Sequence, residues 1–261
     1  MQKRAWVLVV LSLVALEARA QTRVQAPAPA GEFVVTFTER SDEGQAARLR
    51  DVAARVKPLA DQLENLERIE IVVVHSQREL DLRLGLDQAG SVAGVSYLHG
   101  ILFLSPLAWT RNPTDEALTH EMQDAMIRLT VLRLTGGHAA PDWLTQGLVA
   151  NLTKRPFAAA SVELIVQSAP LLLLQWRADD PAVGYWAVRY LLDARGGLTP
   201  VRQLLHILAQ RPDSFVENLE LVYGTPVGDL ERDWRAWLQQ QMEEEKRRRQ
   251  DNREGPLVRD R

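Results

Sequence analysis

A long helix near the middle of the chain is the feature that most constrains how this sequence can fold. Asn112 offers a capping side chain, Pro113 suits the first turn of a helix, and two acids follow where the helix dipole favours negative charge. The glycine pair Gly136-Gly137 is typical of a helix end. These signals predict one helix that starts at Pro113 and runs to Leu134.

The predicted helix carries a polar motif beside its apolar stripe. From His120 to Asp124 the sequence reads HEMQD. Side chains four residues apart on a helix point the same way, so the two imidazoles of a His-Glu-x-x-His helix can hold one zinc ion while the glutamate activates the metal-bound water. In this chain Asp124 stands where the second histidine would be. The positions expected to face the core are Leu118, Met122, Ala125, Leu129 and Leu132.

The segment before this helix, residues 32–111, alternates between strand and helix patterns. An unbroken β-branched run suits a buried strand, and apolar residues at three- and four-residue steps indicate a helix. We interpret the segment as a small mixed α/β unit. Its predicted elements are a strand at Phe33–Phe37, a helix at Asp42–Leu66, a buried strand at Ile69–Val74, a short helix at Gln77–Leu84, and a strand pair or one long edge strand at Gly94–Ser105, interrupted at Gly100.

The rest of the chain, residues 112–242, reads as a mostly helical unit. Together the two units predict the α+β fold class. Residues 243–261 are too polar to pack, so the last helix is expected to protrude and to fray into a charged, disordered tail. The later helices are predicted near Asp142–Lys154, Ala182–Ala194 and Thr199–Gln210, with a last one from about Val227 into residues 239–249.

The N-terminus has the three parts of a secretory signal peptide. A basic start precedes an apolar run from Ala5 to Leu16, and small residues precede a cut after Ala20. No other stretch is long and apolar enough to span a bilayer, so the protein is not expected to cross the membrane. The chain has no cysteine. With residues 1–20 removed and residues 21–31 as a flexible linker, these features favour a bacterial periplasmic or secreted protein.

The charge of the chain gives no reason to expect nucleic acid as a partner. Loss of residues 1–20 removes three basic residues and one acidic residue, which changes the net charge from −3 to −5. Nucleic-acid-binding proteins usually present a basic face. We therefore expect no nucleic acid binding.

Two motifs and their order give the chain a family resemblance. LTHEMQDAMI (residues 118–127) is followed by PDWLTQGLVANL (residues 141–152), then by VGYWAVRYLLDARGGLTPVRQLL and YGTPVGDLERDWRAWL. This order, after an export signal and a small α/β unit, resembles the bacterial peptidase MA-like domains, which belong to the gluzincin metallopeptidases and are related at fold level to thermolysin. The resemblance extends to about Leu238 and implies a zincin-like fold with an edge strand at the cleft.

The resemblance also implies a set of site residues. The family's ligands are the two histidines of H-E-x-x-H and the glutamate of P-x-W-L-x-E-G-L-A, which places ligand positions at His120, Asp124 and Gln146. Glu121 is then the general base, provided that a metal binds. Asp124 replaces a histidine and Gln146 replaces the glutamate. The aspartate carboxylate lies nearer the backbone than an imidazole nitrogen would, and a neutral glutamine is a poor zinc ligand.

These two substitutions predict a degenerate metal site. A complete zinc site contributes about 10–16 kcal/mol over about four ligands, so each compromised ligand costs on the order of 2–4 kcal/mol. Two such losses are enough to empty the site, and no cofactor is expected. Arg128 lies four residues after Asp124, in the favourable orientation for a helical ion pair. We therefore expect a metal-free ladder from His120 through Asp124 to Arg128.

The other histidines and the tryptophans are expected to be structural. His138 lies in a glycine turn, where a solvated side chain is expected rather than a replacement ligand, and His75, His99 and His206 lie beside strands or on an amphipathic helix. The expected core anchors are Trp143, Trp176, Trp186, Trp234 and Trp237.

Three functions stay open at this point. The favoured one is a catalytically inactive module that binds extended peptide or an envelope protein in the cleft, by main-chain pairing along the strand near Gly94–Leu104. The alternative is an active zinc metallopeptidase with a His/Asp ligand set and Glu121 as general base. The third is a structural envelope protein whose charged C-terminal helix makes the contacts.

Overall fold

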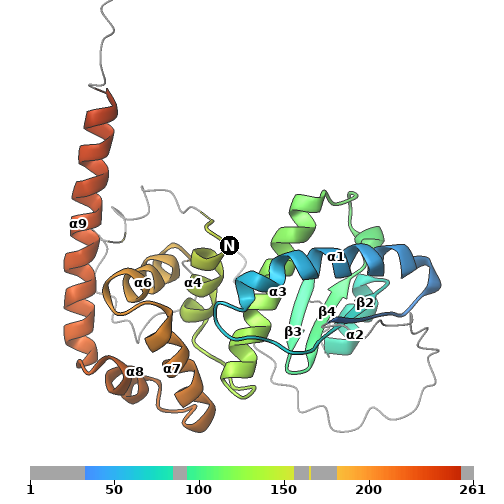
Figure 1. The fold of residues 1–261 in the computed structure, drawn as a ribbon, viewed down its shortest axis with the longest axis horizontal. Helices are drawn as coiled ribbons and strands as arrows, with labels where there is room; N and C mark the ends of the chain where they lie inside the picture. The colour runs from blue at the N-terminus through green and yellow to red at the C-terminus, as the bar shows by residue number, and fades with distance from the viewer. Residues whose placement is uncertain (1–32, 85–92, 156–164, 166–180, 254–261) are drawn as a thin grey trace, which may run out of the picture. The chain divides into compact units, whose positions relative to one another are not determined.

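The computed structural model describes residues 33–84, 93–155, 165 and 181–253 (Figure 1). These residues form two compact units. The first extends to Ala140 and includes Leu205–Pro212, and the second comprises Pro141–Leu204 and the residues from Asp213 onward. The predicted signal peptide and linker lie outside the described residues.

A four-stranded sheet forms the centre of the first unit. Its strands are β1 (Phe33–Phe37), β2 (Ile69–Val74), β3 (Gly94–Tyr97) and β4 (Gly100–Leu104). The order across the sheet is β1-β2-β4-β3, in which the first three strands are parallel and β3 runs antiparallel to β4. Only Leu98 and His99 separate β3 from β4, so this segment is a strand pair joined by a tight turn.

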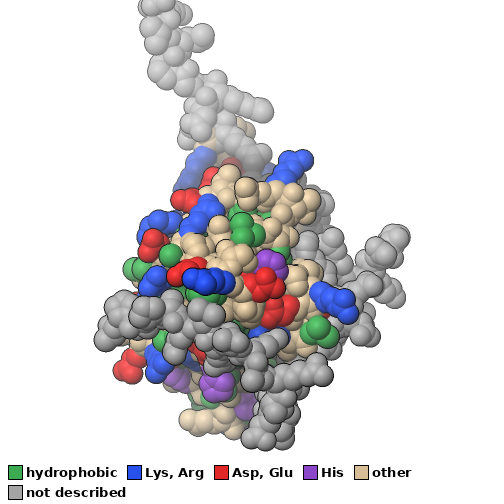
Figure 2. Space-filling model, turned by 90° about the vertical axis from the view of Figure 1, so that its right-hand side faces the viewer, with side chains coloured by type: hydrophobic (Ala, Val, Ile, Leu, Met, Phe, Trp, Pro, Cys, Tyr) green, Lys and Arg blue, Asp and Glu red, His purple; other side chains and the backbone are tan. Residues whose placement is uncertain are grey.

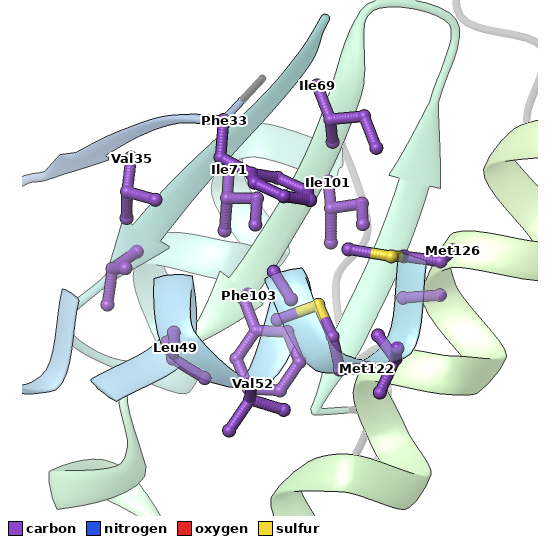
Figure 3. Packing of buried hydrophobic residues seen from close by; sticks show 14 of the residues in the cluster. Phe33, Val35, Leu49, Val52, Ile69, Ile71, Ile101, Phe103, Met122 and Met126 are labelled. Atoms are coloured by element: carbon purple, nitrogen blue, oxygen red, sulfur yellow. The ribbon is translucent and has the colours of Figure 1, made fainter. Parts of the chain in front are cut away.

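The β-branched run forms a central strand because both of its faces are covered. Alternate residues of β2 face the main core, which the sheet shares with α1 (Glu43–Ala60) and α3 (Asp115–Leu134) (Figure 3). Val72 and Val74 face the opposite side, where they pack with Leu80 of α2 (Gln77–Leu84). Burying an aliphatic or aromatic side chain of this size stabilises a fold by about 1.5–3 kcal/mol. The labelled core residues in Figure 3 are Phe33, Val35, Leu49, Val52, Ile69, Ile71, Ile101, Phe103, Met122 and Met126.

The helix α3 begins at Asp115, so the prediction that Asn112 caps it and Pro113 opens it is wrong. Thr114 is the cap: its backbone is extended, and its Oγ1 accepts a hydrogen bond of 3.1 Å from the N–H three residues later. The carbonyl of Pro113 accepts a hydrogen bond of 3.1 Å from Nη2 of Arg48, a side chain of α1. This contact between helices holds Pro113 outside α3. The two acids do lie in the first turn, as predicted.

The end and the core stripe of α3 follow the prediction closely. The helix ends at Leu134, and Gly136 and Gly137 follow it with φ values of 62° and 90°. This left-handed region suits glycine because other residues place a Cβ against the backbone there. Of the predicted stripe, Leu132 is half-buried, and the buried members are Leu118, Met122, Ala125 and Leu129.

The helix α1 is shorter than predicted, because it ends at Ala60 and not at Leu66. Nζ of the buried Lys57 donates to both carboxylate oxygens of Asp61 at 2.8 Å. A cation at this position also suits the negative end of the helix dipole. Leu63 and Leu66 are buried as their spacing indicated, but they lie beyond the helix.

The remaining described helices belong mainly to the second unit. One of these helices was not predicted. The last helix, expected to extend into residues 239–249 and to fray there, is helical to Arg253. Acids placed four residues before bases stabilise a helix in this stretch. Residues 254–261 lie outside the described part. These helices are α4 (Asp142–Leu152), α6 (Pro181–Ala194), α7 (Leu198–Gln210), which the division between the units crosses, the unpredicted α8 (Phe215–Tyr223) and α9 (Val227–Arg253).

The boundary between the two units also differs from the prediction. We expected a division after residue 111, with the HEMQD helix in the helical unit. In the structure α3 packs on α1 and on the sheet, so the first unit continues to Ala140. The small sheet and the predominance of helices confirm the α+β class at this coarser level.

Two glycines allow α4 and α6 to cross closely within the second unit. A Cβ added to Gly147 would lie 2.3 Å from the carbonyl oxygen of Gly184, and one added to Gly184 would lie 2.8 Å from the carbonyl oxygen of Trp143. Nδ2 of the buried Asn151 donates to the carbonyls of Gly147 and Tyr185 at 2.8 and 2.9 Å. The side-chain amide therefore joins the two helices at their crossing.

Tryptophans contribute to the core of the second unit. Trp143 and Trp234 are buried, and Trp186 and Trp237 are half-buried with ring centroids 6.1 Å apart. These four agree with the expectation of core anchors. Trp176 lies outside the described residues.

On the face displayed in Figure 2, Lys and Arg side chains are interspersed with Asp and Glu. Within the described part of the chain, no helix has both the length and the apolar character needed to cross a membrane.

Substitution of Gly147 by alanine tests the close crossing. Gly147→Ala is expected to destabilise the second unit by about 1–3 kcal/mol, because the new methyl group meets the backbone of α6. The control Gly228→Ala adds a methyl group near the start of α9, where nothing lies within 4 Å, and should leave stability unchanged or slightly higher. Thermal unfolding followed by circular dichroism compares the variants. Equal melting temperatures would contradict the crossing.

Candidate functional site

The polar residues of the HEMQD motif lie beside the buried stripe of α3. His120 is exposed, and Glu121 and Asp124 are half-buried. Between them the side chain of Met122 is fully buried, and Ala125 is almost fully buried. Because the buried stripe is held against the sheet and α1, the three polar side chains lie outside this stripe, within little more than one turn of helix. Oδ1 of Asp124 is nevertheless shielded from solvent.

The strand β3 lies directly against the turn of α3 that follows the motif. Oγ of Ser96 donates a hydrogen bond of 2.6 Å to the carbonyl of Ala125, the residue after Asp124. At Gly94, an added Cβ would lie 3.3 Å from Cβ of Ala125 and 3.1 Å from the ring of Phe103. The start of β3 and the motif of α3 are therefore neighbours within the first unit.

The outer edge of β3 presents main-chain groups that β4 does not use. The N–H of Leu104 donates to the carbonyl of Ala93 at 2.7 Å, which marks a hydrogen-bonded pair just before the strand. Such pairs alternate along an antiparallel ladder, so the main-chain groups of Val95 also point toward β4. Those of Gly94 and Ser96 point to the opposite side. Since β3 is the last strand in the sheet order, this side is an edge of the sheet.

Gln146 lies in the middle of α4, in the second unit. It is half-buried, and Gly147 beside it is buried at the crossing with α6. This position is therefore fixed within its own unit by the packing of α4. It carries a neutral amide where the family resemblance implies a carboxylate.

The donor set does not fit a catalytic zinc ion. Such a site takes three good protein ligands and keeps one position open for water. His120, Asp124 and Gln146 offer one imidazole, one carboxylate on a short side chain and one neutral amide. In the described residues, no group of three or more His, Cys, Asp or Glu side chains is arranged to hold a metal ion. The role of Glu121 as general base stays conditional on a bound metal.

The predicted ladder along α3 stays a prediction. His120, Asp124 and Arg128 follow one another at four-residue steps on one continuous helix, which is the spacing that side-chain pairing requires. Asp124 and Arg128 are both half-buried.

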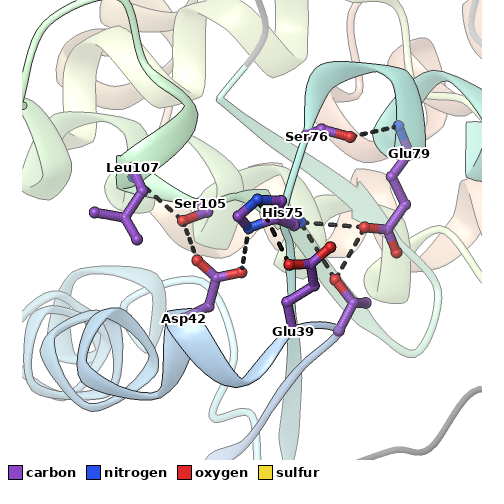
Figure 4. Close-up of polar contacts among 8 residues, drawn as sticks. Glu39, Asp42, His75, Ser76, Glu79, Ser105 and Leu107 are labelled. Carbon is purple, nitrogen blue, oxygen red and sulfur yellow. Dashed lines mark hydrogen bonds and ion pairs between the residues drawn. The ribbon is translucent and has the colours of Figure 1, made fainter.

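A second polar cluster lies where the parallel strands end, and the sequence analysis did not identify it. The carboxylate of Asp42 is fully buried just before α1 (Figure 4). Its Oδ1 accepts a hydrogen bond of 2.6 Å from Ser105, the residue after β4, and its Oδ2 lies 3.0 Å from Nδ1 of His75, the residue after β2. Nε2 of His75 lies 3.7 Å from the exposed carboxylate of Glu39.

Further polar contacts extend this cluster beside β1 and α2. Oε2 of Glu79 accepts hydrogen bonds from Oγ1 of Thr38 at 2.9 Å and from the N–H of His75 at 3.1 Å. The contacts join residues that follow β1 and β2 to the first turn of α2. His75 thus has structural partners, in line with the expectation from the sequence, and the cluster fastens the carboxyl ends of the strands.

Comparisons with known proteins identify no relative. A scan against protein-family models finds no match, and a search of curated proteins finds none either.

Introducing the ligands that the family resemblance implies tests the chemistry of the donor set. The double variant Asp124→His with Gln146→Glu is expected to bind about one zinc ion per chain, whereas the parent purified without chelator should contain far less. Metal analysis of untagged protein by mass spectrometry measures both. Adding His120→Ala to the double variant is the control and should abolish the gain. Stoichiometric zinc in the parent would support the metallopeptidase, and no zinc in the double variant would contradict the degenerate site.

Proposed function

We propose that this protein is an exported, peptidase MA-like module that binds extended peptide segments without cleaving them. The proposal takes the zincin-like arrangement, the signal peptide with its cut near Ala20 and the periplasmic or secreted location from the sequence. The bound segment belongs to a free peptide or to an extended part of an envelope protein.

The observation that carries the proposal is the position of β3. It is an edge strand with outward-pointing main-chain groups at Gly94 and Ser96, and it lies against the turn of α3 that follows Asp124. An extended peptide can add to such an edge as a further strand, with main-chain hydrogen bonds for affinity and side-chain contacts for specificity. All four residues of β3 are half-buried, so the strand is partly exposed.

The same observation explains why binding does not need zinc. Strand addition uses backbone groups, which the substitutions at Asp124 and Gln146 leave unchanged. Hydrolysis would need a metal-bound water, and the donor set does not support one. Loss of the ligands therefore removes cleavage and leaves recognition.

The size of the edge sets the expected affinity. The two outward-pointing residues offer two N–H and two C=O groups, and each hydrogen bond contributes a net of about 0.5–1.5 kcal/mol. Four such bonds give about 2–6 kcal/mol before the cost of association is subtracted, so main-chain pairing alone gives binding no tighter than about millimolar. Tighter binding requires contacts from the peptide's side chains, and these set the specificity.

Proline at Ser96 tests strand addition. Ser96→Pro removes the outward N–H, and an edge strand tolerates proline where the N–H does not bond within the sheet. Binding of short, labelled, unstructured peptides, measured by fluorescence anisotropy, is expected to weaken about tenfold, which corresponds to about 1.4 kcal/mol.

The matched control for this experiment is Ser96→Ala. Both variants lose the hydrogen bond from Ser96 to Ala125, but only the proline variant loses the main-chain donor. Ser96→Ala should bind peptide within about twofold of the parent, since its edge is intact. Circular dichroism confirms the fold of both. Equal affinities of the proline and alanine variants would refute pairing at this edge.

Truncation after Leu238 separates the edge from the charged helix as the contact surface. Leu238 is buried, and the described side chains that follow it in α9 are exposed or half-buried, so the shortened chain should keep its fold. We expect peptide affinity to change by less than about twofold, because the edge is untouched. The same anisotropy assay measures it. Complete loss of binding with an intact β3 would favour the third function, in which the helix makes the contacts.

A further inference from the structure

A pocket of about 610 Å³ opens on the face of the sheet opposite α1 and α3. Its walls come from β1, from the start of β2, from the β3–β4 turn and from the end of α3. Leu80 of α2 packs with Val72, Val74 and Leu104, so α2 covers this face near the carboxyl ends of the strands. The pocket lies toward their amino ends. Its volume falls within the range of roughly 300–1,000 Å³ that small-molecule sites occupy.

The floor of the pocket depends on Gly100. In the sheet, Gly100 lies between Glu70 of β2 and Tyr97 of β3. The hydroxyl of Tyr97 donates a hydrogen bond of 3.3 Å to Oε2 of Glu70 across this gap. A Cβ on Gly100 would lie 2.0 Å from the carbonyl oxygen of Glu70. The missing side chain therefore permits both the close approach of the strands and the polar contact above them.

A buried hydroxyl without a partner belongs to the same pocket. Thr36 lines the wall with only 5% of its surface exposed, and its Oγ1 has no hydrogen-bond partner. Buried hydroxyls in proteins are nearly always hydrogen-bonded, because leaving one unsatisfied is unfavourable. A ligand can supply the missing partner.

Two guanidinium groups line the pocket without a carboxylate partner. Arg133 donates to the carbonyls of Arg68, Leu98 and His99 at 3.0 to 3.2 Å, and no ion pair of Arg68 or Arg133 occurs within the described residues. Burial lowers the pKa of Arg133, and the nearby charge of Glu64 opposes this shift without an ion pair. The exposed His99 adds a third nitrogen-bearing side chain.

We propose that this pocket binds a small solute that carries a carboxylate or phosphate group. Arg68 and Arg133 face the anionic group, since guanidinium groups match the geometry of both oxyanions. Thr36 takes a hydrogen bond from the body of the solute, and Glu70 accepts one from a donor on it. The site is separate from the edge of β3 and does not depend on peptide binding there.

Titration with two probes tests the proposal and distinguishes its two chemistries. Inorganic phosphate and succinate are titrated into the protein by isothermal calorimetry at constant ionic strength. Saturable binding of either probe is expected, and the probe that binds more tightly identifies the preferred oxyanion. Absence of saturable binding with both probes overturns the proposal.

Three variants assign the binding to the pocket. Arg68→Gln should weaken the probe about tenfold, as expected for a lost charge-assisted hydrogen bond. Arg55→Gln is the control, because it removes the same charge from an exposed position on α1, and its effect should stay below about twofold. Thr36→Val should also weaken binding, with a melting temperature equal to or above that of the parent, since it replaces an unsatisfied hydroxyl. Equal weakening by Arg68→Gln and Arg55→Gln would show attraction by net charge alone and would overturn the proposal.

Discussion

The burial of one stripe of α3 against the sheet is the constraint on which the first unit depends. Met122 and Leu118 are fully buried in the same core as the inner faces of β2 and β4, and this sets the rotation of the helix about its axis. Once the rotation is set, His120, Glu121 and Asp124 lie outside this buried stripe. The hydrogen bond from Ser96 to Ala125 then ties the edge strand to the same turn. The packing of the buried stripe of α3 therefore determines where the polar residues of the motif lie, although the stripe itself is apolar.

Local signals predicted the long elements well, and each of the errors has its own physical cause. The extent of α3 was visible from its acids and from Gly136-Gly137, but its first residue was not, because Arg48 of α1 binds the carbonyl of Pro113. The spacing of Leu63 and Leu66 correctly indicated burial and wrongly indicated helix, since burial does not require helical backbone. The missed α8 is a helix of only nine residues, which offers little periodicity.

The candidate site shows the same division between local and distant information. The motif on α3 could be recognised from the sequence because its residues lie within one helix. The outward-pointing groups of β3 depend on its pairing with β4, and pairing is a property of two segments. The bond between Asp42 and Ser105 joins residues 63 positions apart, and only their places after the strands and before α1 hinted at a common edge. The sequence could not predict that the buried hydroxyl of Thr36 has no hydrogen-bond partner, because threonine is a common residue in strands.

The absence of a side chain at Gly100 also fixes the register of the β3–β4 hairpin against β2. A shift of β4 by one residue along β2 would bring the branched side chain of Ile101 opposite Glu70, where even a methyl carbon has no room. Because the turn of two residues couples β3 rigidly to β4, the edge strand cannot slide either. Side chains along β3 can therefore be exchanged while the spacing of its free amides and carbonyls stays constant. A partner that pairs with the main chain of β3 would therefore find its N–H and C=O groups at the same positions, whatever side chains β3 carries.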